Sequence, residues 1–218
     1  AGTSPDGLLY LVLELVEGEP IDRYADTRSL AVEVRLRLFA RVCDAVAFAH
    51  RNLVLHRDIK ANNVLVTSSG EPKLLDFGIA KLLAPDGGDP EMTHAGSLRP
   101  LTPEWASPEQ LRGEPLTTAS DVYALGVLLH VLLVGRRPHR ATGDSPEALA
   151  ERISAAGDVR LGAAREAAPG VERRRLRGDL EWIVARALAP EVERRYATAA
   201  ELGADVDRLL AGLPVRAH

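Results

Sequence analysis

The chain has 218 residues, 46% of them apolar, which is enough to bury a hydrophobic core in one domain or a little more. Its formal net charge of −4 gives no electrostatic reason to expect nucleic acid or an anionic membrane surface as a partner. The single cysteine, Cys43, cannot form an internal disulfide and fits a reducing compartment such as the cytoplasm. No signal peptide is predicted, and the longest apolar run, residues 122–134, is too short to span a bilayer and is interpreted as a buried helix.

The first residues predict one short strand. Asp6-Gly7 is a hairpin signal, and the apolar residues 8–13 that follow are typical of a strand. Nothing upstream is available to pair with this strand, so we expect the chain to begin in the middle of a sheet. The charged, glycine-containing residues 14–18 end the strand before a helical pattern starts.

A long helix is predicted from Ser29, its expected N-cap, to about His50. Its apolar residues recur at steps of three and four: Leu36, Phe39, Cys43, Val46 and Ala49. This spacing indicates a face that packs in the core. We interpret His50 as a capping or packing residue, because no second metal-type ligand stands at a matching spacing.

A polar loop follows this helix. Residues 56–63 read His-Arg-Asp-Ile-Lys-Ala-Asn-Asn, and the apolar residues 53–55 and 64–66 on either side predict a strand, a loop and a strand. Asp-Phe-Gly follows at residues 76–78, after another apolar run.

The side chains of this loop suit phosphoryl transfer. Asp58 can orient an acceptor hydroxyl and take its proton, while oxygens of Asn63 and Asp76 can hold the magnesium ion that neutralises a triphosphate. Lysine is rare in the chain: of 27 basic residues only three are lysines, at positions 60, 73 and 81. Lys60 is therefore interpreted as a functional residue rather than a generic positive charge, because a compact ammonium contacts phosphate differently from a planar guanidinium. We interpret Lys73 and Lys81 as solvated surface charges.

Together, the motifs at 56–63 and 76–78 resemble the catalytic core of the protein kinase family. The similarity is closest to bacterial serine/threonine kinases of eukaryotic type, judged from Ser-Pro-Glu-Gln at 107–110 and Asp-Val-Tyr-Ala-Leu-Gly-Val at 121–127. The resemblance implies an α+β fold, a mainly α-helical kinase large lobe with a short remnant of the small-lobe sheet. It implies these boundaries: 1–13 for the small-lobe remnant, 14–18 for the hinge, 19–212 for the large lobe and 213–218 for the start of a linker.

The resemblance also implies an activity and a set of site residues. The chain would belong to a serine/threonine protein kinase that uses ATP and Mg²⁺ to phosphorylate protein substrates. The implied roles are catalysis for Asp58, Lys60, Asn63 and Thr102, metal binding for Asn63 and Asp76, and adenine binding for Leu13, Glu14, Val16 and Leu65.

Residues 82–105 are polar and rich in glycine and proline, and the resemblance makes them the activation segment. Thr102 would hydrogen-bond the catalytic Asp and Lys, which favours a serine or threonine acceptor over tyrosine. Arg57 would order the segment by binding a phosphate, and Thr93 and Ser97 are the nearest hydroxyl candidates for carrying it.

The second half of the chain predicts three further helices, near 145–156, 179–189 and 198–211. Asp121 is either a simple carboxylate at a helix N-terminus or, by resemblance, a buried Asp that braces the catalytic loop. The resemblance also pairs Glu109 with Arg195 as a buried ion pair. The basic run 173–177 stands near acidic residues and is interpreted as a solvated loop.

Two departures from the family pattern stand out. Ala61 replaces the usual proline, which removes some loop rigidity but no catalytic group. The 218 residues also contain no glycine-rich phosphate loop, no small-lobe Lys and no helix Glu to pair with it, so we expect this chain by itself to bind ATP poorly or not at all.

Two alternatives to an active protein kinase stay open. A pseudokinase acting as a binding or scaffolding module is disfavoured by the intact Asp58, Lys60, Asn63 and Asp76. A small-molecule phosphotransferase is disfavoured by the long segment that ends in Ser-Pro-Glu. The sequence leaves open the oligomeric state and any membrane anchoring by segments outside this chain.

Overall fold

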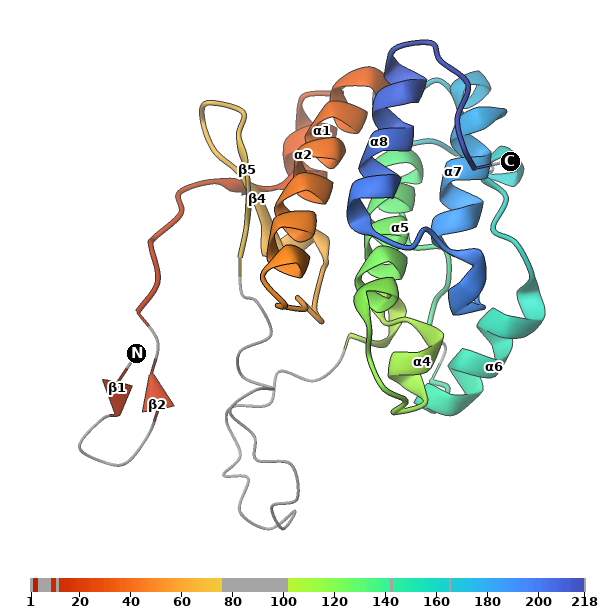
Figure 1. Cartoon of the computed structure of the whole chain (residues 1–218). Coiled ribbons are helices and arrows are strands. Elements are labelled where there is room, and N and C mark those ends of the chain that lie inside the picture. The colour runs from red at the N-terminus through yellow and green to blue at the C-terminus, as the bar shows by residue number, and fades with distance from the viewer. Residues whose placement is uncertain are drawn as a thin grey trace.

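The computed structural model describes residues 2–3, 9–10, 12–75, 102–141, 143–164 and 166–217. It has a mainly helical body in which α2, α8, α5 and α7 lie side by side, with α4 and α6 at one end (Figure 1). Two small antiparallel sheets complete the described part. This confirms the expected α+β fold, with a mainly helical large lobe and a small remnant of sheet.

The first sheet corrects one prediction. It pairs β1 (Gly2–Thr3) with β2 (Leu9–Tyr10), with Gly2 opposite Tyr10. The expectation that nothing upstream pairs with the predicted strand is therefore wrong, because the chain folds back on itself. Residues 12–18 follow without regular secondary structure and lead to the second sheet.

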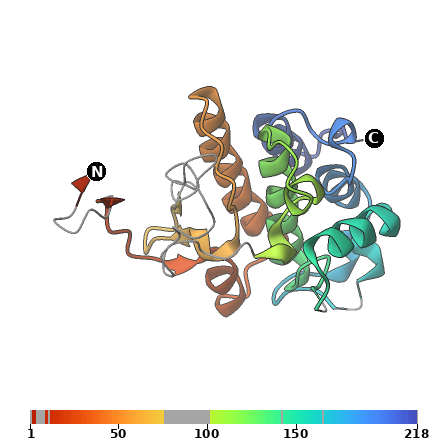
Figure 2. The ribbon, with the colours of Figure 1, turned by 90° about the horizontal axis from the view of Figure 1, so that it is seen from below.

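The second sheet has the order β3-β4-β5, with both pairs antiparallel. Its strands are β3 (Glu19–Pro20), β4 (Val64–Val66) and β5 (Pro72–Leu74). Figure 2 shows these strands on the side of the helical body that faces the N-terminus, with the C-terminus on the opposite side. The sheet thus lies beside the polar loop that precedes β4.

Seven α-helices are described. They are α1 (Ile21–Thr27), α2 (Val32–Arg51), α4 (Pro108–Leu111), α5 (Thr118–Val134), α6 (Pro146–Ala156), α7 (Asp179–Ala187) and α8 (Ala199–Leu210). Short 3₁₀ turns lie at Ala61–Asn63, Pro103–Trp105, Leu161–Ala163, Arg173–Leu176 and Val192–Arg194. The three helices predicted in the second half are confirmed as α6, α7 and α8.

The start of the long helix differs from the prediction. Ser29 has φ +46° and lies in the turn after α1, and the N-cap of α2 is Ala31, which makes no side-chain capping bond. The side chain of Arg35, in the first turn of α2, holds the start of this helix in place instead. Its side chain is fully buried and donates hydrogen bonds to four backbone carbonyls and to Asp26.

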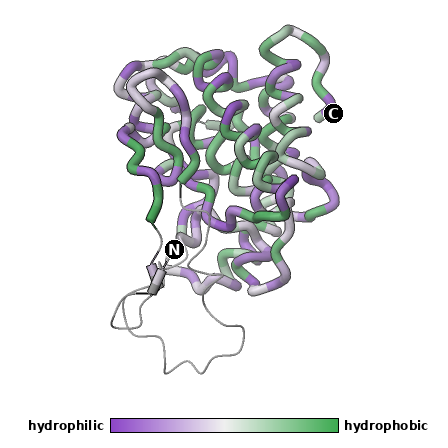
Figure 3. Tube along the Cα trace, turned by 60° about the vertical axis from the view of Figure 1, so that its left-hand side comes forward, coloured by the Kyte–Doolittle hydropathy of each residue, from purple (hydrophilic) through white to green (hydrophobic). Residues whose placement is uncertain are grey.

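Helix α5 is the centre of the core, and its residues 119–134 are all buried. A Cβ added at Gly126 would stand 3.0 Å from side-chain atoms of Ala187 and Leu188, so glycine allows α5 to pack closely against α7. Figure 3 shows hydrophobic and hydrophilic segments interspersed through the helical body, as expected where one face of a helix lies in the core. Within the described ranges, no helix is both long and apolar enough to cross a membrane.

Candidate active site

The polar loop begins at the C-terminal end of α2. Leu53 has φ +59°, and the amides of Leu53 and Val54 donate to His50 O and Ala49 O at 3.0 Å each. These bonds close the last turn of α2, a common way for a helix to end. The strand predicted at residues 53–55 is therefore wrong, whereas the strand predicted after the loop is β4.

The side chains of Lys60 and Asn63 both contact Asp58 in this loop. Lys60 Nζ lies 2.8 Å from Asp58 Oδ2 and 3.1 Å from Oδ1. The Asn63 amide nitrogen donates to Asp58 Oδ2 at 2.9 Å and to the Asp58 carbonyl at 2.7 Å. The Asp58 side chain is 27% exposed, so the carboxylate is held by two partners and is still open to solvent on one side.

The loop is tied to the end of β5, next to Asp76. Leu75 N donates to Asn63 O at 2.8 Å, and His56 Nε2 lies 2.8 Å from Leu75 O. The Asp58 amide points at His56 Nδ1 at 3.4 Å, so Nδ1 accepts and Nε2 donates. These contacts hold residue 75 beside Asn63. Asp76 itself lies outside the described residues, as do Thr93 and Ser97.

Asp121 holds the polar loop through hydrogen bonds. This confirms the interpretation of Asp121 as a buried carboxylate that braces the loop. The backbone amides of His56 and Arg57 donate to its two carboxylate oxygens at 2.8 and 2.9 Å. The carboxylate thereby helps hold Arg57 at φ +65°, a backbone conformation that a non-glycine residue adopts only at a cost of about 1–3 kcal/mol. His50 Nε2 also contacts Asp121 Oδ2, at 2.8 Å. Reasoning from the sequence missed this contact, although His50 and His56 flank the turn at the end of α2.

Thr102 lies close to the loop. It lines a cavity of about 10 Å³ together with Arg57, Asp58 and Gln110, and the Gln110 side-chain amide donates to Arg57 O at 3.0 Å. Among the described residues, no hydrogen bond joins the Thr102 hydroxyl to Asp58 or Lys60. The structure thus places Thr102 near Asp58 without the predicted bonds.

The residues implied for adenine binding come from two elements. Leu13 and Glu14 are exposed and Val16 is half-buried, all on the extended residues 12–18. Leu65 is in β4, opposite Pro20 of β3, and its Cβ would stand 3.1 Å from a Cβ added at Gly18. The structure brings Leu65 next to Gly18, at the end of the extended segment.

A model of the family described as the protein kinase domain matches residues 3–201. The chain belongs to the protein kinase family. The polar loop at residues 56–63 lies in its large lobe.

Similar proteins in this family come from bacteria. The serine/threonine-protein kinase PknB of Mycobacterium tuberculosis is 34% identical over 218 residues, which is all of this chain and 33% of that protein. The serine/threonine-protein kinase PrkC of Bacillus subtilis is 34% identical over 134 residues, 61% of this chain and 20% of that protein. A probable PknB of Lactococcus lactis is 34% identical over 142 residues, 65% of this chain and 22% of that protein. The chain spans about a third of the length of the first of these relatives.

Protein kinases use ATP and Mg²⁺, and one side chain of this kinase domain fits a metal ligand. Both hydrogen bonds of the Asn63 side chain use its nitrogen, which leaves the amide oxygen for a cation. In the described ranges no three His, Cys, Asp or Glu residues cluster as a metal site would need. Mg²⁺ binds in such enzymes through one or two protein oxygens together with phosphates and water.

Proposed function

We propose that this chain is the catalytic large lobe of a serine/threonine protein kinase, which transfers the γ-phosphate of ATP to hydroxyl groups of protein substrates. The observation that carries the proposal is the cluster of Asp58, Lys60 and Asn63 on one loop, with contacts of 2.7–3.1 Å. The similar bacterial proteins named as serine/threonine kinases support it.

Asp58 is the residue we assign to the acceptor hydroxyl. Its carboxylate accepts from Asn63 and Lys60 and remains 27% exposed, so a substrate hydroxyl has room to donate to it. Lys60 lies 2.8 Å from the same carboxylate, close enough to neutralise charge that develops on the transferring phosphoryl group. Both residues act by positioning and electrostatics, which carry most of the catalysis in phosphoryl transfer.

Asn63 and Asp76 are the residues we assign to Mg²⁺. The ion neutralises phosphate charge when it is bound, and the protein supplies hard oxygen ligands. Leu75 supports this role, because its two backbone bonds hold the residue before Asp76 beside Asn63 and His56.

We assign adenine binding to Leu13, Glu14, Val16 and Leu65, and acceptor choice to Lys60 and Thr102. The pairing of β3 with β4 supports the first assignment, because it brings Leu65 to the end of the segment that carries Val16. The cavity that Thr102 and Asp58 both line supports the role of Thr102, and the contact of Lys60 with the Asp58 carboxylate supports the role of Lys60. Weak ATP binding by these 218 residues alone stays a prediction.

The test compares variants of the full-length gene product that carries this chain. Asp58→Ala should reduce turnover by roughly 10²- to 10⁴-fold and leave ATP affinity nearly unchanged, because Asp58 acts on the acceptor. Asp76→Ala should also abolish Mg²⁺-dependent nucleotide binding. Glu114→Ala, at an exposed carboxylate, is the matched control. Turnover of Asp58→Ala above a tenth of wild type would overturn the assignment, and a wild-type protein that binds partners without phosphotransfer would favour the scaffolding alternative.

Activity under this proposal depends on a phosphate bound by Arg57. In active full-length protein, mass spectrometry should find phosphate on Thr93 or Ser97, and changing both to Ala should lower the activity. The loss should be absent in an Arg57→Ala background, because the guanidinium is the group that reads the phosphate. An unmodified segment in a fully active enzyme would contradict this regulation.

A further inference from the structure

A second polar cavity is lined by none of the residues of the loop at 56–63. It has a volume of about 430 Å³ and is formed where α5 ends, by residues 136–140, and where α6 ends, by residues 156–164. Six of its lining residues are basic or imidazole side chains: His130, Arg136, Arg137, His139, Arg140 and Arg160. Asp158 is the acidic residue of the lining.

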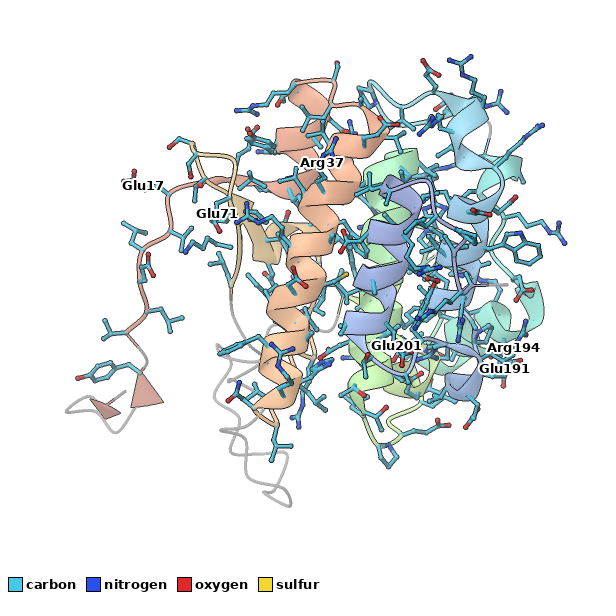
Figure 4. The ribbon with its side chains drawn as sticks, turned by 45° about the horizontal axis from the view of Figure 1, so that its top comes forward. Glu17, Arg37, Glu71, Glu191, Arg194 and Glu201 are labelled. Carbon is cyan, nitrogen blue, oxygen red and sulfur yellow. The ribbon has the colours of Figure 1, made fainter. Side chains whose placement is uncertain are left out.

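The positive charge of this cavity is only partly neutralised by its surroundings. Arg137 pairs with Glu104 at 2.5 Å, and Asp158 pairs with Arg194 at 3.1 Å (Figure 4 labels Arg194). Arg194 does not line the cavity, so the carboxylate of Asp158 pairs with an arginine outside the cavity rather than with one of the lining arginines. Among the described parts of the chain, no acidic side chain forms an ion pair with Arg136, Arg140 or Arg160.

These arginines are not needed to cap the helix that ends at the cavity. The amide of Gly135, at φ +76°, donates to Val131 O and terminates α5. The carbonyl of Arg136 accepts from His130 Nδ1 at 2.8 Å, so it is the backbone of Arg136 that closes the turn. No hydrogen bond of an Arg136 or Arg160 side chain is present within the described residues. Their guanidinium groups therefore remain available to a ligand.

The two histidines line the cavity without adding positive charge. Burial lowers the pKa of His130 to about 4, despite its bond to the Arg136 carbonyl. Burial, with Arg152 nearby, also lowers the pKa of His139. Both rings are therefore neutral near pH 7, and an anion in the cavity would favour their protonated forms.

We propose that this cavity binds a phosphorylated serine or threonine of a partner protein. Arginine forks bind phosphate through paired charge-assisted hydrogen bonds, and a phosphoryl group carries about −1.5 to −2 charge at pH 7. That charge matches several unpaired guanidinium groups better than a single carboxylate does. The cavity volume, within the roughly 300–1,000 Å³ typical of ligand sites, leaves room for the residues next to the phosphate. The site does not depend on the proposed kinase activity.

Binding is tested by fluorescence anisotropy with the full-length protein and three labelled heptapeptides, without ATP. The peptides have the sequence Ala-Gly-Ala-X-Ala-Gly-Ala, where X is phosphoserine, glutamate or serine. We expect the phosphoserine peptide to bind at least about tenfold more tightly than the other two. Arg136→Ala and Arg160→Ala should each weaken it by about tenfold or more, because each removes charge-assisted hydrogen bonds.

Two matched controls separate this site from other basic surfaces. Arg173→Ala, at an exposed arginine on the turn before α7, should leave binding unchanged. Arg57→Ala tests the other arginine that is proposed to bind phosphate, and it should not change binding at this cavity because Arg57 is not one of the lining residues. If Arg160→Ala loses its fold by circular dichroism, Arg160→Lys replaces it and should still weaken binding, since lysine lacks the planar fork.

Three outcomes would overturn the proposal. Equal binding of the glutamate and phosphoserine peptides would show a general acidic surface. Binding that is insensitive to Arg136 and Arg160, or that is lost with Arg57, would place the phosphate elsewhere. No binding of any peptide would leave the arginines without this role. None of these outcomes bears on phosphotransfer, which is measured separately through Asp58.

Discussion

Both terminal nitrogens of Arg195 donate to the carboxylate of Glu109, at 2.7 and 2.9 Å, although the two residues are 86 positions apart. The side chains are 0% and 6% exposed. Arg195 also donates to the carbonyls of Ala189, Ala119 and Pro190, and Ser120 Oγ donates to Glu109 at 2.8 Å. This confirms the expected buried pair, which connects α4 and the start of α5 to the segment before α8.

Removing Arg195 should destabilise the chain strongly. Arg195→Met leaves Glu109 buried without its cation, and breaking such a pair costs about 3–5 kcal/mol. Arg194→Met is the matched control: its side chain is 57% exposed and pairs with Asp158 and Glu191 at the surface (Figure 4), so its loss should cost about 0–1 kcal/mol. Urea unfolding measures both free energies. Equal values for the two variants would contradict the buried pair.

The same pair gives folding a pH dependence of known sign. Burial by itself raises the pKa of Glu109, but the hydrogen bond and charge of Arg195 outweigh it, so the pKa is lowered from its ordinary 4.5. A lowered folded-state pKa contributes stability that is full above the unfolded-state pKa and is lost as pH falls through the folded-state value. The Glu109→Gln/Arg195→Met double variant lacks the titrating pair and serves as the reference. We therefore expect the unfolding free energy of wild type to fall relative to that of the double variant as pH drops below about 4.5. A difference that stays constant down to acid pH would contradict this.

Arg35 should be the most costly arginine to remove from α2. Its side chain is fully buried, and Arg35→Met would leave four backbone carbonyls without their donor. We expect a loss of at least about 3 kcal/mol, because each unsatisfied buried acceptor costs about 1–3 kcal/mol. Arg37, two residues on and exposed (Figure 4), is the control, and Arg37→Met should change stability by less than about 0.5 kcal/mol. Similar losses in thermal unfolding would contradict the anchoring role.

The sequence predicted helices α2, α5, α6, α7 and α8, because apolar periodicity and long apolar runs report which residues are buried, but it did not predict the short helices α1 and α4. The prediction of Ser29 as the N-cap of α2 was wrong, because a helix can begin without a side-chain cap. Here the buried Arg35 side chain holds the start of α2 in place. In a chain whose positive charge is almost all arginine, Arg35 looked generic. Its position next to Leu36 and four residues before Phe39, on the apolar face, was the available signal.

The polar loop was predicted from its motif, because Asp58, Lys60 and Asn63 are close in sequence and the side chains of Lys60 and Asn63 contact that of Asp58 within the same loop. Contacts across the fold were harder to foresee. The bond from His50 to Asp121 joins residues 71 positions apart, and periodicity assigned His50 only to the end of its helix. The irregular residues 53–55 were missed for a similar reason, because apolar content does not show whether a partner strand is present.

The last prediction concerns Asp121, which accepts from two backbone amides of the loop. Asp121→Asn keeps the shape but replaces one acceptor oxygen by a nitrogen that cannot accept, so at least one amide loses a bond to a charged group worth about 1.5–3 kcal/mol. Amide hydrogen exchange, read by NMR, should speed up at His56 or Arg57, and turnover of the full-length protein should fall because Arg57 adjoins Asp58. Asp44→Asn, at an exposed carboxylate of α2, should change neither. Unchanged exchange at both His56 and Arg57 in Asp121→Asn would mean that the loop holds its strained conformation without this carboxylate.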